Sequence, residues 1–413
     1  MRILFLLAAF TGLSSVAAGQ ILHALLPGTS PLRYGTFDAE TGTWLDIDTL
    51  AFTDGFISGT GTWDHWAGHY LFAGFSPEAT SATLWSWDGL ENTIVHAPNL
   101  AGDIGALHQD LSTALFYGLG SAIVDSNFVN LGGGAGYWDY TFELQVRSVD
   151  PATGAVTDVV SLPFLTGYYS GSSTFDSDAH RYHLLGVDAL GSTRLVTVDV
   201  AAQAVVASPP TAPELALHEL EAGLDADRVW ALRAPGASGD SWAWVELNLI
   251  TGAATELATL PGIDGFIGDA SALDQTTGRY AFAYIDALAA GRLRVIDAAT
   301  GSTVADHLLD VGVAELHADN RVFAVAAYGT PSSVAPPPSA RVAQPVFPNP
   351  TSAAVTCSSR LAGRLVVVDG SGSDVWSCEV PAGAHRLDLA ALPTGLYLLC
   401  LPDGSRQRVQ VVQ

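Results

Sequence analysis

Lysine is absent from this chain of 413 residues, and all 17 basic residues are arginine. Together with 42 acidic residues they give a formal charge of −25. Binding to nucleic acid or to an anionic membrane surface needs a cationic patch, so this composition argues against both as partners. Cysteine is also scarce, and three residues exclude a fold that depends on a disulfide framework.

Long hydrophobic runs are missing as well. Beyond the first twenty residues, no apolar stretch approaches the roughly 20 residues of a transmembrane helix. Residues 1–20 have the pattern of a signal peptide, with Arg2, an apolar run from Ile3 to Phe10, and small residues at 16–19. We therefore expect an exported, soluble chain without a transmembrane segment.

The acidity is confined to one part of the chain. Residues 21–330 contain 10 arginines and 37 acidic residues, a net charge of −27, whereas residues 331–413 have a net charge of +1. One interpretation of this acidic region is that its charge keeps the protein soluble in saline water. The alternative is that the acidic surface binds Ca²⁺. No other cofactor is expected.

The middle of the chain repeats with a period close to 49 residues. In each repeat a strand ends in Asp or Asn and a turn follows, and four of the six repeats have Gly four residues later. Because Asp and Asn accept turn N–H groups and Gly adopts positive φ, we interpret these positions as structural. The turn-opening residues are Asp38, Asp88, Asp150, Asp199, Asn248 and Asp297, and the glycines are Gly42, Gly154, Gly252 and Gly301.

Each repeat also contains a Gly- and Ser-rich strand followed by an aromatic strand. Four short strands per repeat, with no helical stretch, are typical of β-propeller blades, and small residues suit the crowded axis. The count predicts an all-β fold, a six-bladed β-propeller of four-stranded blades over residues 21–330. Its last blade takes its first strands from the C-terminal end and its last from residues 32–50. One strand is then spare, either Ile21–Leu26 or Val322–Ala327, and a seven-bladed ring is the alternative.

A second unit follows the repeats. Residues 331–344 contain four prolines and form a stiff linker, and residues 345–413 alternate short strands with turns, which predicts a small β-sandwich. Its cysteines at 357, 378 and 400 fall on strands, either as buried small residues or with one pair in a disulfide.

Several strings of this second unit match a known pattern. They are Pro348-Asn349-Pro350, the turn Asp369-Gly370, Leu387-Asp388-Leu389, and Leu392-Pro393-Thr394-Gly395-Leu396-Tyr397. Residues 345–413 thereby resemble the C-terminal sorting domain of type IX secretion cargo, a system of the Bacteroidetes. The resemblance implies partnership with the secretion machinery and its sortase. It also implies passage across the outer membrane, ending in the medium or on the cell surface.

Ligands of propellers usually bind at one mouth of the central channel. The most unusual segment there spans about residues 120–140, between a second and a third strand, and holds a glycine run followed by aromatics. Aromatic faces stack on sugars and peptide side chains, although the insertion would equally cover a blade edge. The candidate ligand-binding residues are Tyr137, Trp138, Tyr140, Phe56, Tyr168, Tyr169, Phe266 and Glu219.

Recognised catalytic and metal motifs are lacking. There is no G-x-S-x-G, H-E-x-x-H or C-x-x-C, and the sialidase box of some six-bladed hydrolases is absent. His108, His218 and His317 occupy different offsets in their repeats, so no three-histidine zinc site is expected. No catalytic residue and no metal ligand is assigned.

Three functions remain open. The leading hypothesis is a non-enzymatic module that binds a glycan or a protein. The alternatives are a hydrolase or lyase acting on polysaccharide or peptide, and a structural surface protein without a ligand. Enzymatic chemistry would use mouth carboxylates from the set Asp103, Glu219, Asp264 and Asp269.

Overall fold

The computed structural model divides into two compact units, Met1–Val334 and Ala335–Gln413. It describes residues 20–27, 31–75, 81–89, 91–132, 135–212, 215–223, 228–236, 241–329, 354–359, 363–368, 374–380, 383–400 and 406–411. For residues 126–132 and 135–140, and for some strand residues of the second unit, only the backbone is described. The expected signal peptide, the linker and Pro348-Asn349-Pro350 lie outside the described residues.

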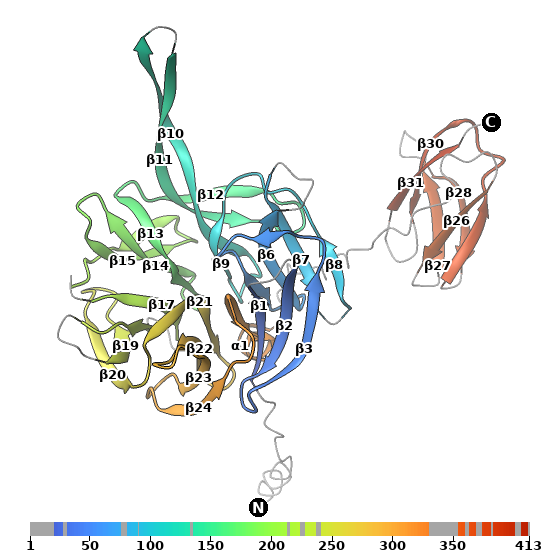
Figure 1. Cartoon of the computed structure of the whole chain (residues 1–413). Coiled ribbons are helices and arrows are strands. Elements are labelled where there is room, and N and C mark those ends of the chain that lie inside the picture. Colours follow the sequence, from blue (N-terminus) through green and yellow to red (C-terminus); the bar gives the residue numbers. More distant parts are fainter. Residues whose placement is uncertain are drawn as a thin grey trace, which may run out of the picture. The chain divides into compact units, whose positions relative to one another are not determined.

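The first unit is a six-bladed β-propeller of four-stranded antiparallel blades, as the turn count predicts (Figure 1). From the axis outward, the closing blade consists of β25 (Glu315–Ala318), β1 (Ile21–Leu26), β2 (Leu32–Asp38) and β3 (Thr43–Leu50). Blade 2 consists of a split inner strand, β4 (Gly55–Phe56) and β5 (Thr62–Asp64), then β6 (His69–Phe75), β7 (Thr83–Asp88) and β8 (Thr93–His96). Blade 3 consists of β9 (Gly105–Gln109), β10 (Phe116–Gly132), β11 (Ala135–Val149) and β12 (Val156–Ser161).

The remaining blades follow the same order. Blade 4 consists of β13 (Leu165–Asp176), β14 (Arg181–Asp188), β15 (Thr193–Asp199) and β16 (Ala204–Ala207). Blade 5 consists of β17 (Leu217–Ala222), β18 (Val229–Arg233), β19 (Trp242–Leu247) and β20 (Ala254–Leu260). Blade 6 consists of β21 (Gly265–Asp274), β22 (Arg279–Ile285), β23 (Gly291–Asp297) and β24 (Thr303–Leu308).

The Asp and Asn residues that open the third-to-fourth-strand turns are structural, as predicted. Asp38 Oδ1 accepts the N–H groups of Glu40 and Thr41 at 2.9 and 3.2 Å. The other five accept turn N–H groups in the same way. The glycines at 42, 154, 252 and 301 have φ of +72°, +70°, +70° and +71°, the left-handed region that closes these turns.

Ring closure differs from the prediction in one respect. A single C-terminal strand, β25, pairs with β1, and β1 to β3 supply the rest of the closing blade. Residues 322–327, one of the two predicted spare strands, instead lie in the helix α1 (Arg321–Tyr328). The all-β fold class is confirmed, whereas the strand expected at Val322–Ala327 is wrong. The physical reason is that β1 occupies the pairing edge of β25, so the apolar, alanine-rich run that follows has no strand to join.

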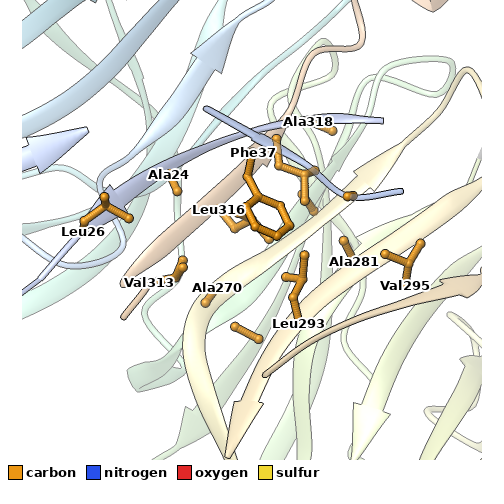
Figure 2. Packing of buried hydrophobic residues seen from close by; sticks show 14 residues of the cluster. Ala24, Leu26, Phe37, Ala270, Ala281, Leu293, Val295, Val313, Leu316 and Ala318 are labelled. Carbon is orange, nitrogen blue, oxygen red and sulfur yellow. The ribbon is translucent and has the colours of Figure 1, made fainter. Parts of the chain in front are cut away.

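Packing between neighbouring blades forms the core. Leu26 and Phe37 of the closing blade pack with Leu293 and Val295 of blade 6, and Leu316 of β25 joins them (Figure 2). Since this cluster joins residues from both ends of the unit, burial of its apolar area stabilises the closed ring.

One hairpin departs from the repeat. Strands β10 and β11 pair from Phe116↔Val149 to Gly132↔Ala135, whereas their neighbours β9 and β12 pair only with the lower part. Residues 121–132 therefore run on as a two-stranded ribbon of roughly 40 Å, which extends beyond the blades in Figure 1. The segment that the sequence suggested as a loop insertion is thus a strand extension. Of its glycine run, 133 and 134 lie outside the described residues.

The second unit is a small β-sandwich, as expected. One sheet pairs β26 (Ala354–Ser359) with β29 (Gly383–Asp388). The other has the order β28 (Asp374–Val380), β27 (Gly363–Val368), β30 (Gly395–Cys400) and β31 (Arg406–Val411). Leu365, Val367 and Leu399 are buried between them, and Cys378 carries a free, half-buried thiol. No helix in the described ranges of either unit is long and apolar enough to cross a bilayer.

Candidate functional site

The innermost strands of the blades run in the same direction, so the two faces of the ring differ. One face carries the connections between the second and third strands of each blade and the loops that lead into the innermost strands. We call this face the mouth face. In five blades one residue of the innermost segment has a backbone in the left-handed region, and in blade 2 this residue lies between β4 and β5. Pairing with the next strand is interrupted around it in blades 4, 5 and 6. Such bulges redirect side chains. The five residues are Gly59, Ala106, Gly171, Glu219 and Asp269.

Asp269 joins three blades at the level of these bulges. Its Oδ2 accepts hydrogen bonds from Ser58 Oγ of blade 2 at 2.9 Å and from Ser170 Oγ of blade 4 at 2.8 Å. Both serines are exposed, so this network lies where the channel opens onto the mouth face. A left-handed aspartate costs about 1–2 kcal/mol, which the network offsets. We call these three residues the throat.

Glu219 is buried beside the throat. Its Oε1 accepts the Asp269 N–H at 2.9 Å and its Oε2 accepts the Ser271 hydroxyl at 2.7 Å. Burial raises the pKa of Glu219 well above its ordinary value, because a charged carboxylate loses its hydration there. The side chain therefore ties blade 5 to blade 6.

Glu315 does the same between the closing blade and blade 2. Its Oε1 accepts the Gly59 N–H at 2.7 Å, and its Oε2 accepts the Tyr70 hydroxyl at 3.3 Å. Burial, with the charge of Asp269 nearby, raises the pKa of Glu315 to about 8. A Cβ at position 61 would lie 1.9 Å from Glu315 Oε2, so only glycine fits there. Burial likewise raises the pKa of Glu221 to about 8.

An axial cavity of about 130 Å³ is lined by these carboxylates together with His108 and His317. This volume has room for several water molecules, and it is well below the roughly 300–1,000 Å³ of pockets that enclose organic ligands.

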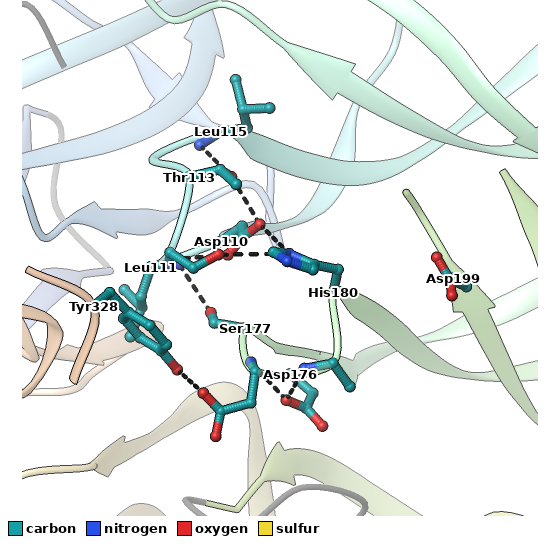
Figure 3. Close-up of polar contacts among 12 residues, drawn as sticks. Asp110, Leu111, Thr113, Leu115, Asp176, Ser177, His180, Asp199 and Tyr328 are labelled. Atoms are coloured by element: carbon teal, nitrogen blue, oxygen red, sulfur yellow. Dashed lines mark hydrogen bonds and ion pairs between the residues drawn. The ribbon is translucent and has the colours of Figure 1, made fainter. Parts of the chain in front are cut away.

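Helix α1 crosses the opposite face. Its N-terminal Asn320 donates to His65 Nδ1 of blade 2 at 2.9 Å and to the Leu273 carbonyl of blade 6 at 3.0 Å. At its other end the Tyr328 hydroxyl donates to Asp178 Oδ1 of blade 4 at 2.6 Å (Figure 3). Because blade 4 stands opposite the closing blade in a ring of six, the helix spans the channel.

The three histidines do not converge. His108 and His317 line the cavity, whereas His218 packs against the rings of Trp242 and Phe266. Burial lowers the pKa of His108 to about 4 and that of His317 to about 3, so both imidazoles are neutral near pH 7. Within the described ranges, no three His, Cys, Asp or Glu side chains are grouped so that they could hold a metal ion.

The candidate mouth aromatics have different environments. Phe56, Tyr168 and Phe266 are half-buried against the cores of blades 2, 4 and 5 to 6, respectively. Tyr169 is exposed, with its hydroxyl 3.3 Å from Thr193 Oγ1. Of this group, Tyr169 is the one available for stacking.

The hairpin carries the remaining aromatics. Tyr137, Trp138 and Tyr140 lie on β11, where the description covers the backbone alone. At the base of the ribbon, Ile123 and Phe142 face each other in register and are 58% and 61% exposed.

Two of the four candidate carboxylates come together, Glu219 and Asp269. Asp103 instead forms an ion pair with Arg147 at 2.6 Å, and Asp264 lies exposed on the mouth face. Sequence reasoning missed Glu221 and Glu315. The available signal was that both stand four residues before the Asp that ends the small-residue segment of their repeat.

Comparison with known proteins gives one family match. Residues 345–412 match the family described as secretion system C-terminal sorting domain. No curated protein matches the chain. Among solved structures, the chain is similar to TolB from Acinetobacter baumannii, with 13% identity and a TM-score of 0.49. That match covers 73% of this chain and 66% of the TolB chain.

Two further structures show comparable likeness. A protein of unknown function from Bacteroides caccae has 11% identity and a TM-score of 0.45, covering 73% of this chain and 99% of that one. The Hadza microbial sialidase Hz136 has 8% identity and a TM-score of 0.44, covering 68% and 67%.

The sorting domain expected from the sequence motifs is thereby confirmed. Its presence directs a protein to the extracellular space or the cell surface through the type IX secretion machinery. Residues 345–412 are a type IX secretion C-terminal sorting domain, and this chain is a cargo of that system whose passenger is a six-bladed β-propeller.

Proposed function

We propose that the propeller is an extracellular binding protein without catalytic activity, and that its ligand, a glycan or a protein, docks on the β10–β11 hairpin. The observation that carries this proposal is the exposed apolar pair Ile123 and Phe142 at the base of a ribbon that leaves the propeller core. Exposed apolar side chains that cluster on a projecting element mark interaction surfaces.

The energetics of the ribbon support this. Burying one large apolar side chain contributes about 1.5–3 kcal/mol. A ligand that covers Ile123 and Phe142 would therefore gain affinity from their burial. The aromatic residues Tyr137, Trp138 and Tyr140 further along β11 extend the same surface in sequence.

The channel supports binding rather than hydrolysis. Asp269, Glu219 and Glu315 each accept hydrogen bonds from the protein itself, and the axial cavity of about 130 Å³ is smaller than the pockets that usually enclose organic ligands. A hydrolase would need two carboxylates free to reach a scissile bond.

The proposal is tested on the chain lacking residues 1–20 by a glycan array and a panel of extracellular proteins. We expect Ile123→Ser with Phe142→Ser, and separately Trp138→Ala with Tyr137→Ala, to weaken binding about tenfold or more. Leu45→Ser is the matched control, because Leu45 is 55% exposed on the outermost strand β3. If both hairpin variants bind the ligand with the same affinity as the unmodified chain, the proposal is contradicted. Turnover of polysaccharide by the purified chain also contradicts it.

A further inference from the structure

Two turns on the mouth face share one construction. In blade 4 the turn between β14 and β15 begins at Asp188, whose Oδ1 accepts the N–H groups of Leu190 and Ser192, both at 2.9 Å. Its Oδ2 accepts Arg194 Nε at 2.9 Å, and the Gly191 N–H donates to the Asp188 carbonyl. The side chain at the tip, Leu190, is 90% exposed.

Blade 6 repeats the hydrogen bonds to backbone N–H groups in this turn. Asp286 Oδ1 accepts the N–H groups of Leu288 and Ala290 at 2.9 and 3.0 Å, and the Ala289 N–H donates to the Asp286 carbonyl. Arg292 lies 3.8 Å from Asp286 Oδ2. The tip, Leu288, is 88% exposed. Ala289 has φ of +62°, so the same turn is kept where the residue is not glycine.

The exposure of these leucines contributes nothing to the stability of the fold. Each is held on a turn fixed by an aspartate, so little conformational entropy is lost when the turn meets a partner. The base of the hairpin in blade 3 is the same kind of connection and carries Ile123 and Phe142. Three second-to-third-strand connections thus place apolar side chains on one face.

The charge of this face limits what covers it. Asp54 and Asp264 stand at matching Asp-Gly-Phe positions of blades 2 and 6, and both are exposed. The propeller region carries a net charge of −27, so a second copy or an anionic membrane would be repelled. Aliphatic tips suit apolar pockets on a protein, whereas sugars stack on aromatic faces.

We infer that the mouth face docks a protein whose contact surface has apolar pockets for Leu190 and Leu288, surrounded by Arg or Lys. This inference rests on the proposed binding function and names its partner class. Leu190 and Leu288 act as anchors that enter the apolar pockets. Asp54 and Asp264 attract the Arg or Lys side chains around those pockets.

The experiment uses a random peptide display library as the probe against the chain lacking residues 1–20. We expect enrichment of peptides that combine Arg or Lys with Leu or Phe. Their affinity should fall at least tenfold in Leu190→Ser with Leu288→Ser, and the affinity should weaken with added salt. The control is Ile250→Ser, because Ile250 is 83% exposed on a turn of the opposite face.

The outcomes separate this inference from the proposed function. No enrichment, or peptides that bind the leucine variant unchanged, overturns the inference. Glycan binding that is lost in the hairpin variant and kept in the leucine variant also overturns it, while the proposed function stands. If peptide binding is weakened in the leucine variant and unchanged in the hairpin variant, the inference is supported. The same result contradicts the hairpin as the docking site.

Discussion

The buried carboxyl of Glu315 should make the free energy of unfolding fall as the pH rises above neutrality. Burial raises the pKa of Glu315 to about 8 from an ordinary value of 4.5. Because the folded-state pKa is the higher one, the protonated carboxyl stabilises the fold fully below pH 4.5. That stabilisation is lost progressively as the pH rises to 8.

The magnitude follows from the two pKa values. One unit of pKa difference corresponds to 1.36 kcal/mol, so Glu315 costs the fold about 1.6 kcal/mol between pH 6.5 and pH 8. The buried histidines act in the opposite direction. The pKa values of His108 and His317 are lowered to about 4 and about 3, so their contribution is present above pH 6.5 and lost as the pH falls. The free energy of unfolding should therefore be greatest near pH 6.

Glu315→Gln isolates the acidic contribution. Glutamine does not titrate, its carbonyl still accepts the Gly59 N–H, and its amide can donate to the Tyr70 hydroxyl. Urea unfolding of both proteins, followed by tryptophan fluorescence at pH 6.5 and pH 8, measures the change. We expect the wild type to lose about 1.6 kcal/mol more than the variant.

Exposed Glu91 provides the control, since Glu91→Gln should leave the pH dependence of the wild type unchanged. If the curves of Glu315→Gln and wild type stay parallel from pH 6.5 to pH 8, Glu315 is already charged at pH 6.5. The account of Glu315 as a buried carboxyl that is protonated at pH 6.5 would then be refuted.

Three further predictions concern fold and export. Gly61→Ala should lower the free energy of unfolding by about 1–3 kcal/mol, because the added Cβ would clash with Glu315. Gly167→Ala is the control and should be neutral, because no atom lies within 4 Å of a Cβ at that position. Equal melting temperatures of the two variants would contradict this prediction. A chain without residues 21–50 lacks three strands of the closing blade and should lose its cooperative thermal transition, so melting like the parent would argue against ring closure. A chain without residues 345–413 should stay inside a type IX-competent host, as assayed in medium and on the cell surface, and equal export of both forms would remove the role of the sorting domain.

Local chemistry made the blades predictable. The turn residues Asp38, Asn248 and their equivalents act through hydrogen bonds to N–H groups two or three residues away, so their pattern is visible in the chain. The sorting domain was recognisable for a similar reason, because its motifs are short and contiguous. Counting such turns gave six blades without any knowledge of contacts between blades.

Contacts between blades could not be predicted in this way. Asp269 meets Ser58 and Ser170, which are 211 and 99 residues away, and nothing in the local pattern couples them. The strand expected at residues 322–327 became a helix because ring closure had already filled the adjacent edge, which is a property of the whole ring. The insertion at about residues 120–140 was predicted as a loop, and the pattern of residues there did not reveal that both flanking strands continue through it.

Strongly shifted pKa values usually direct attention to catalysis, and here the geometry favours another origin. The innermost strands are built from small residues, which let six blades converge but provide little apolar surface to hold them together. Glu219 and Glu315 bridge neighbouring blades with hydrogen bonds instead, and burial raises the pKa of both because a charged carboxylate loses its hydration there. The throat and α1 lie at opposite ends of the propeller axis, whereas the exposed apolar side chains of the mouth face and the hairpin lie outside it. The binding proposed for those surfaces is therefore spatially separate from the pH-sensitive carboxyls that line the axis.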